Sequence, residues 1–471
     1  MNKFYITTAI DYVNDTIHLG HAFQKIAADV LARYYRITLR KDNVFFLTGT
    51  DEYGQKAEKA ASLQNISPKE YVKKISDSDE KEQDSLNISY NRFIRTTDSD
   101  HAEVVKEIWN RVQKNGDIYS GQYQGSYCEG CEAYYAKEDL VEGECSIHPT
   151  LEIKIIKEEN YFFKWSKYKD FLIDYITKNP DFIFPRHRAN EMLEFAKNIK
   201  DIPISRSNFT WGIPVPNDSK QVIYVWFDAL INYLTGVGFL KDKKLFEKFW
   251  PADLHILGKD NLRWHALLWP AMLKSAGIEL PKHILVNGFL NINGQKISKS
   301  IGNVIRPSEW VQKYDSDAVR YYLLRYTSIT EDSDISEEKL LQAYNSDLAN
   351  GLGNLVARVA KLAEKHEVSV DTFTKDFNEN VKKFLENFEF NWALNAVWGI
   401  ITLTDTAVSN DKVWKLPVGS KHAEECLLFY IKNIQEIAFN LKPFLPDVAQ
   451  KIEEQFKGPK IISGKPLFPR I

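Results

Sequence analysis

The chain has 471 residues, of which 44% are hydrophobic and 27% charged, and its formal net charge is −3. This composition is typical of a globular protein of about three domains and excludes a disordered, low-complexity chain. Lysine and arginine stripes bind nucleic acid whatever the total charge, so the balance neither favours nor excludes such a partner. No signal peptide or membrane-spanning run is visible, and four cysteines do not suit a disulfide scaffold, so we expect a cytoplasmic protein without a membrane partner.

The first 50 residues predict a strand, a loop, a helix and a second strand. Residues 4–8 are apolar and β-branched, as in a strand. Apolar side chains recur at helical spacing from Leu19 onward, and Val44 to Leu47 form a continuous apolar run typical of a buried parallel strand. The pattern indicates a Rossmann-like, doubly wound α/β fold with ligand groups at the carboxyl ends of the strands.

The composition changes twice further along the chain. Residues 116 to about 205 carry three of the four cysteines and few helical patterns, which indicates an insertion. The α/β pattern then resumes with apolar runs at 222–226, 254–257 and 284–286, and after residue 335 leucines at helical spacing predict a helix bundle. The predicted parts are a catalytic domain in two halves (1–115 and 206–290), an insertion (116–205), a loop and stem-contact region (291–340) and an α-helical domain (341–471).

Two short motifs indicate phosphate chemistry. His18 and His21 flank Gly20 at the start of the predicted helix, where unpaired N–H groups and the helix dipole suit a phosphate. Lys296 and Lys299 lie on a glycine-flanked loop that can close over a triphosphate. Each motif alone is more often incidental, but their joint occurrence favours a two-part grip on ATP.

In this order, His18-Leu19-Gly20-His21 and Lys296-Ile297-Ser298-Lys299-Ser300 resemble the two signatures of class I aminoacyl-tRNA synthetases. The segments 4–10, 49–52, 224–229, 258–260 and 269–273 extend the resemblance to the methionyl-tRNA synthetase family, from residue 4 to the C-terminus. The resemblance implies that ATP and Mg²⁺ activate L-methionine as methionyl-adenylate. The methionyl group is then transferred to the 3′ end of tRNA(Met), including the initiator tRNA, and AMP and pyrophosphate are released.

The resemblance also implies roles for individual residues. Asp51 would bind the amino-acid ammonium group as a charge-assisted partner. Arg206 would order the active site, and Gly258 and Asp260 would lie near the adenosine. The pocket for the methionine side chain, whose thioether gains from aromatic contacts, would be formed by Ile10, Tyr12, Trp226, Ala229, Tyr233, His265 and Trp269.

The chain departs from the family pattern beside this pocket. Family members commonly carry Pro or Tyr where Ala9 and Asp11 stand, and usually His where Tyr53 stands. Without the resemblance, plain core packing would explain most of the pocket aromatics. The departures leave the predicted activity unchanged and affect the detailed shape of the pocket.

The insertion contains two pairs of candidate metal ligands, and two residues separate the members of each pair. Cys128-x-x-Cys131 and Cys145-x-x-His148 form a Cys₃His set, which is typical of a structural zinc site without an open position. The insertion resembles the connective-peptide domain of the single-knuckle branch of the family. Cys426 stands alone on a helical pattern and is most simply a core thiol.

The helical end resembles the anticodon-binding domain of the family. Asn354 and Arg358 lie four residues apart on one helical face, and Trp414 matches a tryptophan on which an anticodon base stacks. A core position is the alternative for Trp414. No oligonucleotide-binding extension follows Ile471 in this sequence, so the resemblance implies a monomer.

Three alternatives stay open. A cysteinyl-tRNA synthetase has both signatures and a zinc, but its zinc lies in the amino-acid pocket. A small nucleotidyltransferase shares the histidine motif but lacks the lysine loop and the helical end. A non-catalytic tRNA-binding homologue would be expected to have lost signature residues.

Overall fold

The computed structural model describes residues 2–128, 130, 133–135, 140–146, 151–297, 302–370 and 376–471. Spatial contacts divide the chain into two compact units. The first contains Met1–Ile17, Asp42–Lys81 and Tyr90–Asn287, and the second contains His18–Lys41, Glu82–Ser89 and Gly288–Ile471. The five-part division expected from the sequence stays a prediction. The two units are defined by spatial contacts, and their boundaries do not test those of the five parts.

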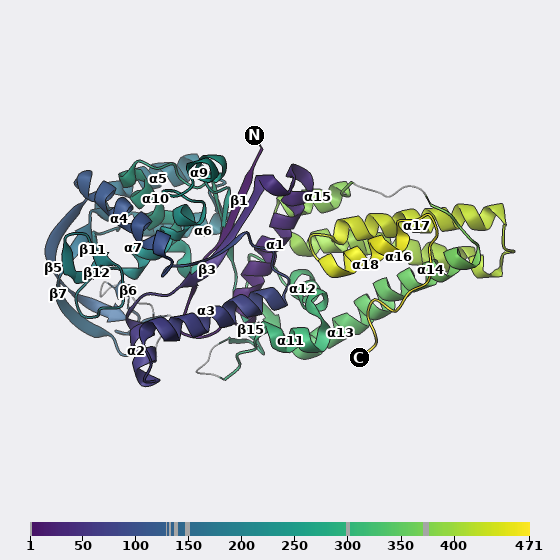
Figure 1. Cartoon of the computed structure of the whole chain (residues 1–471), viewed down its shortest axis with the longest axis horizontal. Coiled ribbons are helices and arrows are strands. Elements are labelled where there is room, and N and C mark those ends of the chain that lie inside the picture. Colours follow the sequence, from purple (N-terminus) through teal and green to yellow (C-terminus); the bar gives the residue numbers. More distant parts are fainter. Residues whose placement is uncertain are drawn as a thin grey trace. The chain divides into compact units, whose positions relative to one another are not determined.

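A seven-stranded parallel sheet forms the centre of the first unit, and Figure 1 shows β1 beside β3 within it. The strands predicted at 4–8, 44–47, 254–257 and 284–286 are confirmed as members of this sheet. In spatial order the strands are β2 (Asp11–Tyr12), β3 (Val44–Asp51), β1 (Phe4–Thr8), β13 (Leu254–Gly258), β14 (His283–Asn287) and β8 (Ile183–Phe184), with β4 (Arg92–Arg95) pairing with β3.

Close packing between β3 and β4 requires glycine at position 49. A Cβ atom at Gly49 would lie 1.9 Å from the carbonyl oxygen of Ile94, far inside van der Waals contact. All eight residues of β3 are buried, as the continuous apolar run predicted. Tyr5, Phe45 and Trp109 belong to the same hydrophobic core.

The expectation that residues 222–226 form another parallel strand is wrong. Only Val222 and Ile223 are extended, at the end of β12 (Asp218–Ile223), which pairs antiparallel with β10 (Ser205–Arg206) and β11 (Pro214–Val215). Tyr224 then serves as the N-cap of helix α7 (Val225–Leu230). A short apolar run does not by itself distinguish a strand from a buried helical turn. Here the residues on both sides of Tyr224 are buried, which explains why the run is apolar although only its first part is a strand.

The first unit also contains a further, antiparallel sheet and several helices. A separate four-stranded sheet follows the order β6 (Ala133–Tyr135), β5 (Ile118–Cys128), β7 (Lys154–Phe163) and β9 (Ile202–Pro203). The helices are α2 (Gln55–Leu63), α4 (Ser99–Lys114), α5 (Lys169–Lys178), α6 (Arg186–Ala196), α7, α8 (Asn232–Gly236), α9 (Lys243–Phe249), the π-helix η5 (Trp264–Leu268) and α10 (Trp269–Ala276), together with α3 (Pro68–Ser85), whose residues from Glu82 onward belong to the second unit.

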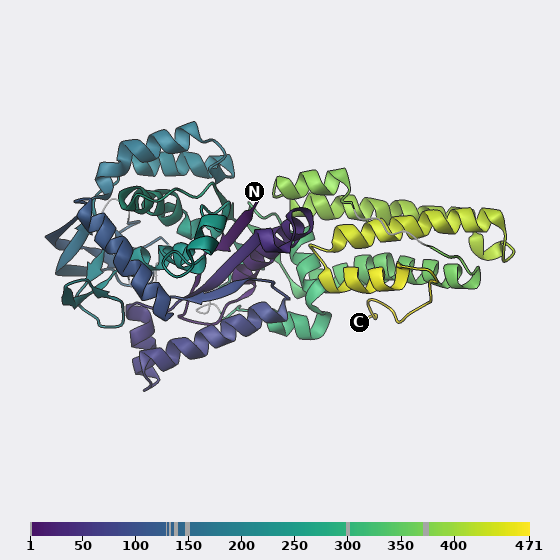
Figure 2. The ribbon, with the colours of Figure 1, turned by 45° about the horizontal axis from the view of Figure 1, so that its top comes forward.

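The second unit combines helix α1 (Leu19–Leu39), a small sheet and a helix bundle. The sheet contains β16 (Gln295–Lys296), β15 (Leu290–Ile292) and β17 (Ser333–Ile335). Figure 2 shows the long helices of the bundle side by side, in green to yellow. The helices are α11 (Pro307–Tyr314), α12 (Ser316–Arg325), α13 (Glu337–Ala343), the π-helix η6 (Tyr344–Gly353), α14 (Asn354–Lys365), α15 (Glu379–Glu386), α16 (Phe390–Asp411), α17 (Lys421–Leu441) and α18 (Pro446–Phe456).

The predicted fold class, a Rossmann-like parallel sheet followed by an all-helical region, is confirmed. The leucines expected on one helical face after residue 335 are largely buried, although a π-helical segment interrupts the α-helix between α13 and α14. Among the described helices, none combines the length and apolar character that crossing a bilayer requires.

Candidate active site

The two histidines of the first motif cap helix α1. The Nδ1 atom of His18 accepts a hydrogen bond from the Gly20 amide at 3.1 Å, and the Nδ1 atom of His21 accepts from the His18 amide at 3.3 Å. Burial, followed by the charges of Lys25 and Lys296, lowers the pKa of His21 to about 3, so this imidazole is neutral at pH 7. Because Nδ1 is an acceptor, the proton of neutral His21 is assigned to Nε2, which can donate to an oxygen of a ligand.

Gly20 is required by the position of the His18 ring. A Cβ atom at residue 20 would lie 2.9 Å from Cε1 of His18, so a side chain there would push the imidazole away from its capping position. The two imidazole centroids are only 4.0 Å apart. A substitution of Gly20 would therefore disturb both histidines.

The expectation that unpaired helix amides face the phosphates is wrong for two residues of the first turn. The Leu19 amide donates to the carbonyl of Ile305 at 3.1 Å, and the Gly20 amide donates to His18. The helix terminus thus satisfies these donors internally. The imidazole Nε2–H groups are then the donors that this turn offers to an oxyanion.

Lys296 lies at the end of a tight hairpin. Asn293 and Gly294 both have positive φ angles, 53° and 72°, as a two-residue turn between β15 and β16 requires. The Lys296 ammonium lies 4.4 Å from the centroid of the Phe289 ring, in a cation–π contact. Phe289 is a neighbour of Lys296 that the motif alone does not reveal.

Tertiary contacts bring the two motifs together. The side chain of Ile297 lies 4.0 Å from the position that a Gly20 Cβ would occupy, and Leu19 bonds to Ile305 just beyond the second motif. The positive charge of Lys296 also acts on His21. Lys299, with Ser298 and Ser300, lies outside the described residues.

The candidate ammonium site lies at the carboxyl end of a strand. Asp51 is the last residue of β3, is buried, and stands in register with Tyr12 of β2. Its backbone carbonyl accepts from the Val13 amide at 3.1 Å. Ile10 and Tyr12 pack, half-buried, against the same hydrophobic core. Ligands of α/β proteins bind at the carboxyl ends of parallel strands, which is where the Asp51 carboxylate lies.

Three residues of the candidate side-chain pocket are in direct contact. The Tyr233 hydroxyl lies 2.7 Å from Nε2 of His265, and the Tyr233 and Trp269 rings lie 6.0 Å apart. Nδ1 of His265 lies 3.0 Å from the Asn261 carbonyl, which can only accept, so Nδ1 carries the proton and Tyr233 donates to Nε2. Burial lowers the pKa of His265 to about 4, which keeps it neutral.

Trp226 and Ala229 belong to the short helix α7, and a tryptophan that we did not predict lies against Trp226. The Trp226 and Trp264 rings are stacked at 4.8 Å and 18°. Trp264 and His265 belong to the π-helix η5, a wide turn that is frequent at functional sites. The signal for Trp264 is its sequence position directly before His265.

The departures from the family pattern lie in the same region. Asp11 is buried. The pKa of Tyr233 is raised, chiefly because Tyr233 itself is buried; a hydrogen bond from Asn232 opposes this rise, and the charge of Asp11 adds to it. Tyr53 packs against Trp211 with ring centroids 5.3 Å apart. Asp11 thus acts through its charge on Tyr233 of the candidate pocket, whereas the ring contact of Tyr53 is with Trp211, which is not among the predicted pocket residues.

The remaining predicted active-site residues occupy three different settings. Arg206 is fully buried, with its guanidinium 4.3 Å from the Tyr127 ring centroid, and its Nη2 donates to Asn208 at 3.2 Å. Gly258 is the buried last residue of β13, whereas Asp260 is exposed in the turn that follows.

Comparison with known proteins gives consistent results. A sequence model described as tRNA synthetases class I (M) matches residues 4–152 and 138–360. The methionine–tRNA ligases of Caldanaerobacter subterraneus and Rickettsia conorii are 38% and 39% identical to this chain, covering 99% and 96% of it and 79% and 92% of their own length. The structure of Mycobacterium tuberculosis methionyl-tRNA synthetase in complex with methionyl-adenylate is 36% identical, with a TM-score of 0.93 over 100% of both chains.

This chain belongs to the class I methionyl-tRNA synthetase family.

The candidate anticodon residues of this methionyl-tRNA synthetase family member lie on the helix bundle. Asn354 is exposed at the start of α14, and Arg358 forms an ion pair with Asp405 of α16 at 2.6 Å. The side chain of Trp414 is 42% exposed, while Val413 beside it is buried. This exposure excludes the alternative of a core position for Trp414.

Two of the four predicted metal ligands are described. Cys128, at the end of β5, and Cys145 are both fully buried, within one hydrophobic core. Cys131 and His148 lie outside the described residues. Among the described residues no group of three potential ligands is present, so the geometry of the predicted zinc site is not part of this structure. Buried thiols are nevertheless the donors that a structural zinc requires.

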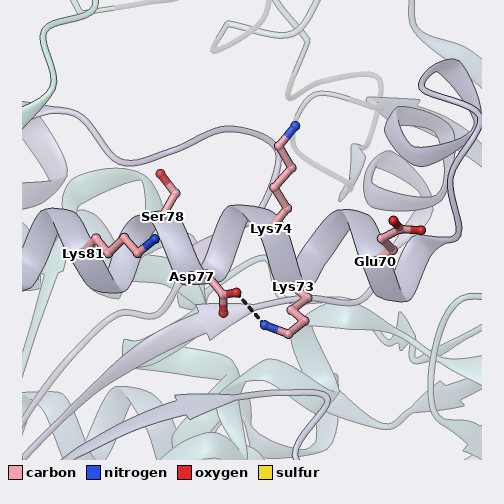
Figure 3. A pocket seen from close by; sticks show the side chains of 6 residues that line it. All are labelled: Glu70, Lys73, Lys74, Asp77, Ser78 and Lys81. Atoms are coloured by element: carbon pink, nitrogen blue, oxygen red, sulfur yellow. Dashed lines mark hydrogen bonds and ion pairs between the residues drawn. The ribbon is translucent and has the colours of Figure 1, made fainter.

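A surface hollow of about 390 Å³ lies on α3 and contains none of the predicted site residues. Its six lining side chains all come from this one helix, and Figure 3 shows the ion pair between Lys73 and Asp77, 2.5 Å long, among them. An exposed pair of this kind contributes little, so the hollow is an ordinary solvated helix face.

Proposed function

We propose that this chain is a methionine–tRNA ligase that activates L-methionine with ATP and transfers it to tRNA(Met). The observation that carries the proposal is the arrangement of two imidazoles and one ammonium group: His18 caps helix α1, His21 is neutral, and the charge of Lys296 acts on His21. The same chain also contains the buried carboxylate of Asp51 and a candidate aromatic pocket. The first group suits a polyphosphate, and the second suits an apolar amino acid.

The first step joins the methionine carboxylate to the α-phosphate of ATP and releases pyrophosphate. The carboxylate is already ionised, so no general base is required. Acceleration then comes from positioning and from stabilising charge on the phosphate oxygens. We assign this stabilisation to the Nε2–H groups of His18 and His21 and to the ammonium groups of Lys296 and Lys299. Mg²⁺ accompanies ATP and neutralises part of its charge when bound.

The hydrogen bonds of the candidate pocket explain a preference for a thioether. Tyr233 donates to His265, and His265 donates to Asn261, so these polar groups satisfy one another without the ligand. A thioether sulfur is only a weak acceptor and leaves no strong donor unpaired, whereas a hydroxyl or ammonium side chain would bring polar groups without partners. The pocket therefore favours an unbranched apolar side chain with a polarizable atom.

The experiment that tests the proposed function is ATP–pyrophosphate exchange with a panel of amino acids. We expect exchange with methionine and not with cysteine, leucine or isoleucine. Exchange only with cysteine would favour a cysteinyl-tRNA synthetase, and no exchange with any amino acid would favour a non-catalytic tRNA-binding protein.

Trp414 supplies a test of the tRNA-binding part. Stacking of an unpaired base on an aromatic ring contributes about 1–3 kcal/mol, so Trp414→Ala should raise the KM for tRNA(Met) by roughly 5- to 150-fold. Exchange without tRNA should be unchanged. The matched control is Trp392→Ala, because Trp392 is 54% exposed in the same bundle and has no predicted role. Equal effects of both substitutions would contradict the assignment of Trp414.

We also propose one structural zinc held by Cys128, Cys131, Cys145 and His148. Cys145→Ser should lower the zinc content from about one ion per chain toward zero and destabilise the insertion, because ligand loss removes metal-linked folding energy. The matched control is Cys426→Ser on α17, which should keep its zinc. Zinc can be counted with a chromogenic chelator and stability followed by thermal unfolding. Full zinc in the Cys145 variant would overturn the proposed ligand set.

The predictions of a monomer and of a cytoplasmic location complete the proposal. Its substrates would be ATP, methionine and tRNA, which meet where translation takes place. Light scattering of the purified chain at micromolar concentration tests the monomer, and a mass of twice 54.5 kDa would contradict it.

A further inference from the structure

One buried imidazole joins two short helices that carry three residues of the candidate methionine pocket. Nε2 of His101, on α4, lies 3.2 Å from Oδ1 of Asp228 on α7, and its Nδ1 lies 3.0 Å from the hydroxyl of Thr235 on α8. All three residues are at most 1% exposed. The same helices carry Trp226 and Ala229 on α7, and Tyr233 on α8.

The hydrogen-bond directions show what His101 contributes. The Thr235 hydroxyl donates to the Ile231 carbonyl at 3.3 Å, so Nδ1 of His101 is the donor to Thr235. The bond between Nε2 and Asp228 then contains one proton, held by the imidazole or by the carboxyl group. In either form the pair is neutral overall, which lowers the cost of burying it.

Helices α7 and α8 depend on such contacts because they are very short. They contain six and five residues, and neither has a side-chain hydrogen bond at its N-cap. Isolated helices of this length are not stable in water, so their positions are set by tertiary contacts. Arg92 supports the same arrangement, since its Nη1 donates to the Thr235 carbonyl at 3.1 Å and its Nη2 pairs with Asp98 and Asp100.

We propose that His101 and Asp228 are positioning residues for methionine binding, in which one imidazole holds α7 and α8 in the arrangement that the methionine side chain requires. The inference rests on the proposed function, because it assigns the three pocket side chains to methionine. The second carboxyl oxygen of Asp228 is buried without a hydrogen-bond partner among the described residues, so His101 is the polar contact that restrains this side chain.

Two substitutions of His101 separate positioning from bulk stability. Glutamine places its amide nitrogen near the position of Nε2 and can still donate to Asp228, whereas asparagine reaches only the position of Nδ1 and leaves Asp228 without its donor. His101→Asn should raise the KM for methionine in ATP–pyrophosphate exchange by about tenfold or more, the effect of losing a hydrogen bond to a charged group. The kcat and the KM for ATP should change less than threefold. His101→Gln keeps the bond to Asp228 and loses the bond to Thr235, so it should raise the KM for methionine less than His101→Asn does.

A second pair keeps the test decisive if the His101 variants fold poorly. Thr235→Val removes the acceptor for Nδ1 at nearly constant volume, and Thr235→Ser retains it. Only the valine variant should raise the KM for methionine. Asp253→Asn is the control for a buried carboxylate, because Asp253 bonds to the Tyr5 amide at 2.8 Å at the opposite, amino end of the strands. It should lower thermal stability and leave the KM for methionine unchanged.

The outcomes distinguish the two proposals. Wild-type exchange with methionine together with an unchanged KM in folded His101→Asn and Thr235→Val variants overturns the positioning role alone. Equal increases in the KM for methionine and in the KM for ATP, seen in the His101 and Thr235 variants and also in Asp253→Asn, overturn it as well. Such increases would indicate general destabilisation. Absence of methionine-dependent exchange in the wild type overturns the proposed function and this inference with it.

Discussion

Replacing Lys296 or Lys299 with alanine should slow methionyl-adenylate formation by about 10²–10³-fold, the usual effect of removing one preorganised group from a developing oxyanion. The affinity for methionine should change by less than about twofold, because neither lysine belongs to the amino-acid pocket. Lys296 acts on His21 through its charge and contacts the Phe289 ring. Pre-steady-state formation of adenylate and equilibrium binding of methionine give the two numbers separately.

The control for this prediction is Lys339→Ala. Lys339 is an exposed lysine of the same unit that pairs with Asp334 at 3.7 Å, so its removal should change adenylate formation by less than about twofold. Equal losses in the rate of adenylate formation and in methionine affinity would contradict the role of Lys296 and Lys299 in stabilising charge.

Replacing Arg320 with methionine should destabilise the second unit by about 3–5 kcal/mol, which is the second large effect that we expect. Arg320 is fully buried and pairs with the equally buried Asp29 of α1 at 2.8 Å. Its guanidinium also donates to the carbonyls of Phe444 at 2.8 Å, Pro443 at 3.0 Å and Leu86 at 3.2 Å. Loss of Arg320 would thus leave one carboxylate and three buried carbonyls with fewer partners.

The charge of Arg320 is essential because Asp29 is ionised in the interior. Burial opposes ionisation, yet the guanidinium groups of Arg320 and Arg33 hold the pKa of Asp29 below its usual value. Arg320→Lys should restore only part of the stability, since one ammonium does not reach all four oxygens. Urea unfolding followed by circular dichroism measures the loss.

Two further variants sharpen this test. The double variant Asp29→Leu/Arg320→Met should be more stable than Arg320→Met alone, because it leaves no unpaired buried carboxylate. Arg188→Met, at a partly exposed pair with Glu191, should change stability by no more than about 1 kcal/mol. A similar small effect at Arg320 would contradict the structural role assigned to it.

Local patterns were sufficient for the elements that carry the two motifs. The strands at 4–8 and 44–47, the helix from Leu19 and the helical end follow from periodicity, because side-chain spacing reports directly on the exposed and buried faces of a regular element. The run at 222–226 shows the limit of this method. Five apolar residues are compatible with a strand or with a buried helical turn, and the pairing of β12 with β10 and β11 decides between them.

The family resemblance placed candidate residues along the chain, but it did not show how they are held. The tautomers of His21 and His265 depend on partners whose positions are set by folding, namely the His18 amide and the Asn261 carbonyl. The Phe289 ring beside Lys296 and the Trp264 ring against Trp226 were likewise visible only in the structure.

The sequence by itself therefore determined the fold class and the positions of the two motifs, since these depend on residue type and local spacing. The candidate methionine-binding side chains were named by the family resemblance and not by spacing. Tertiary structure alone decided which side chains support them. His101 lies 127 residues from Asp228 along the chain, and Arg320 is 291 residues from Asp29, so no local pattern relates either pair. Buried polar groups must find partners wherever folding brings donors and acceptors together, and that requirement acts through space rather than along the sequence.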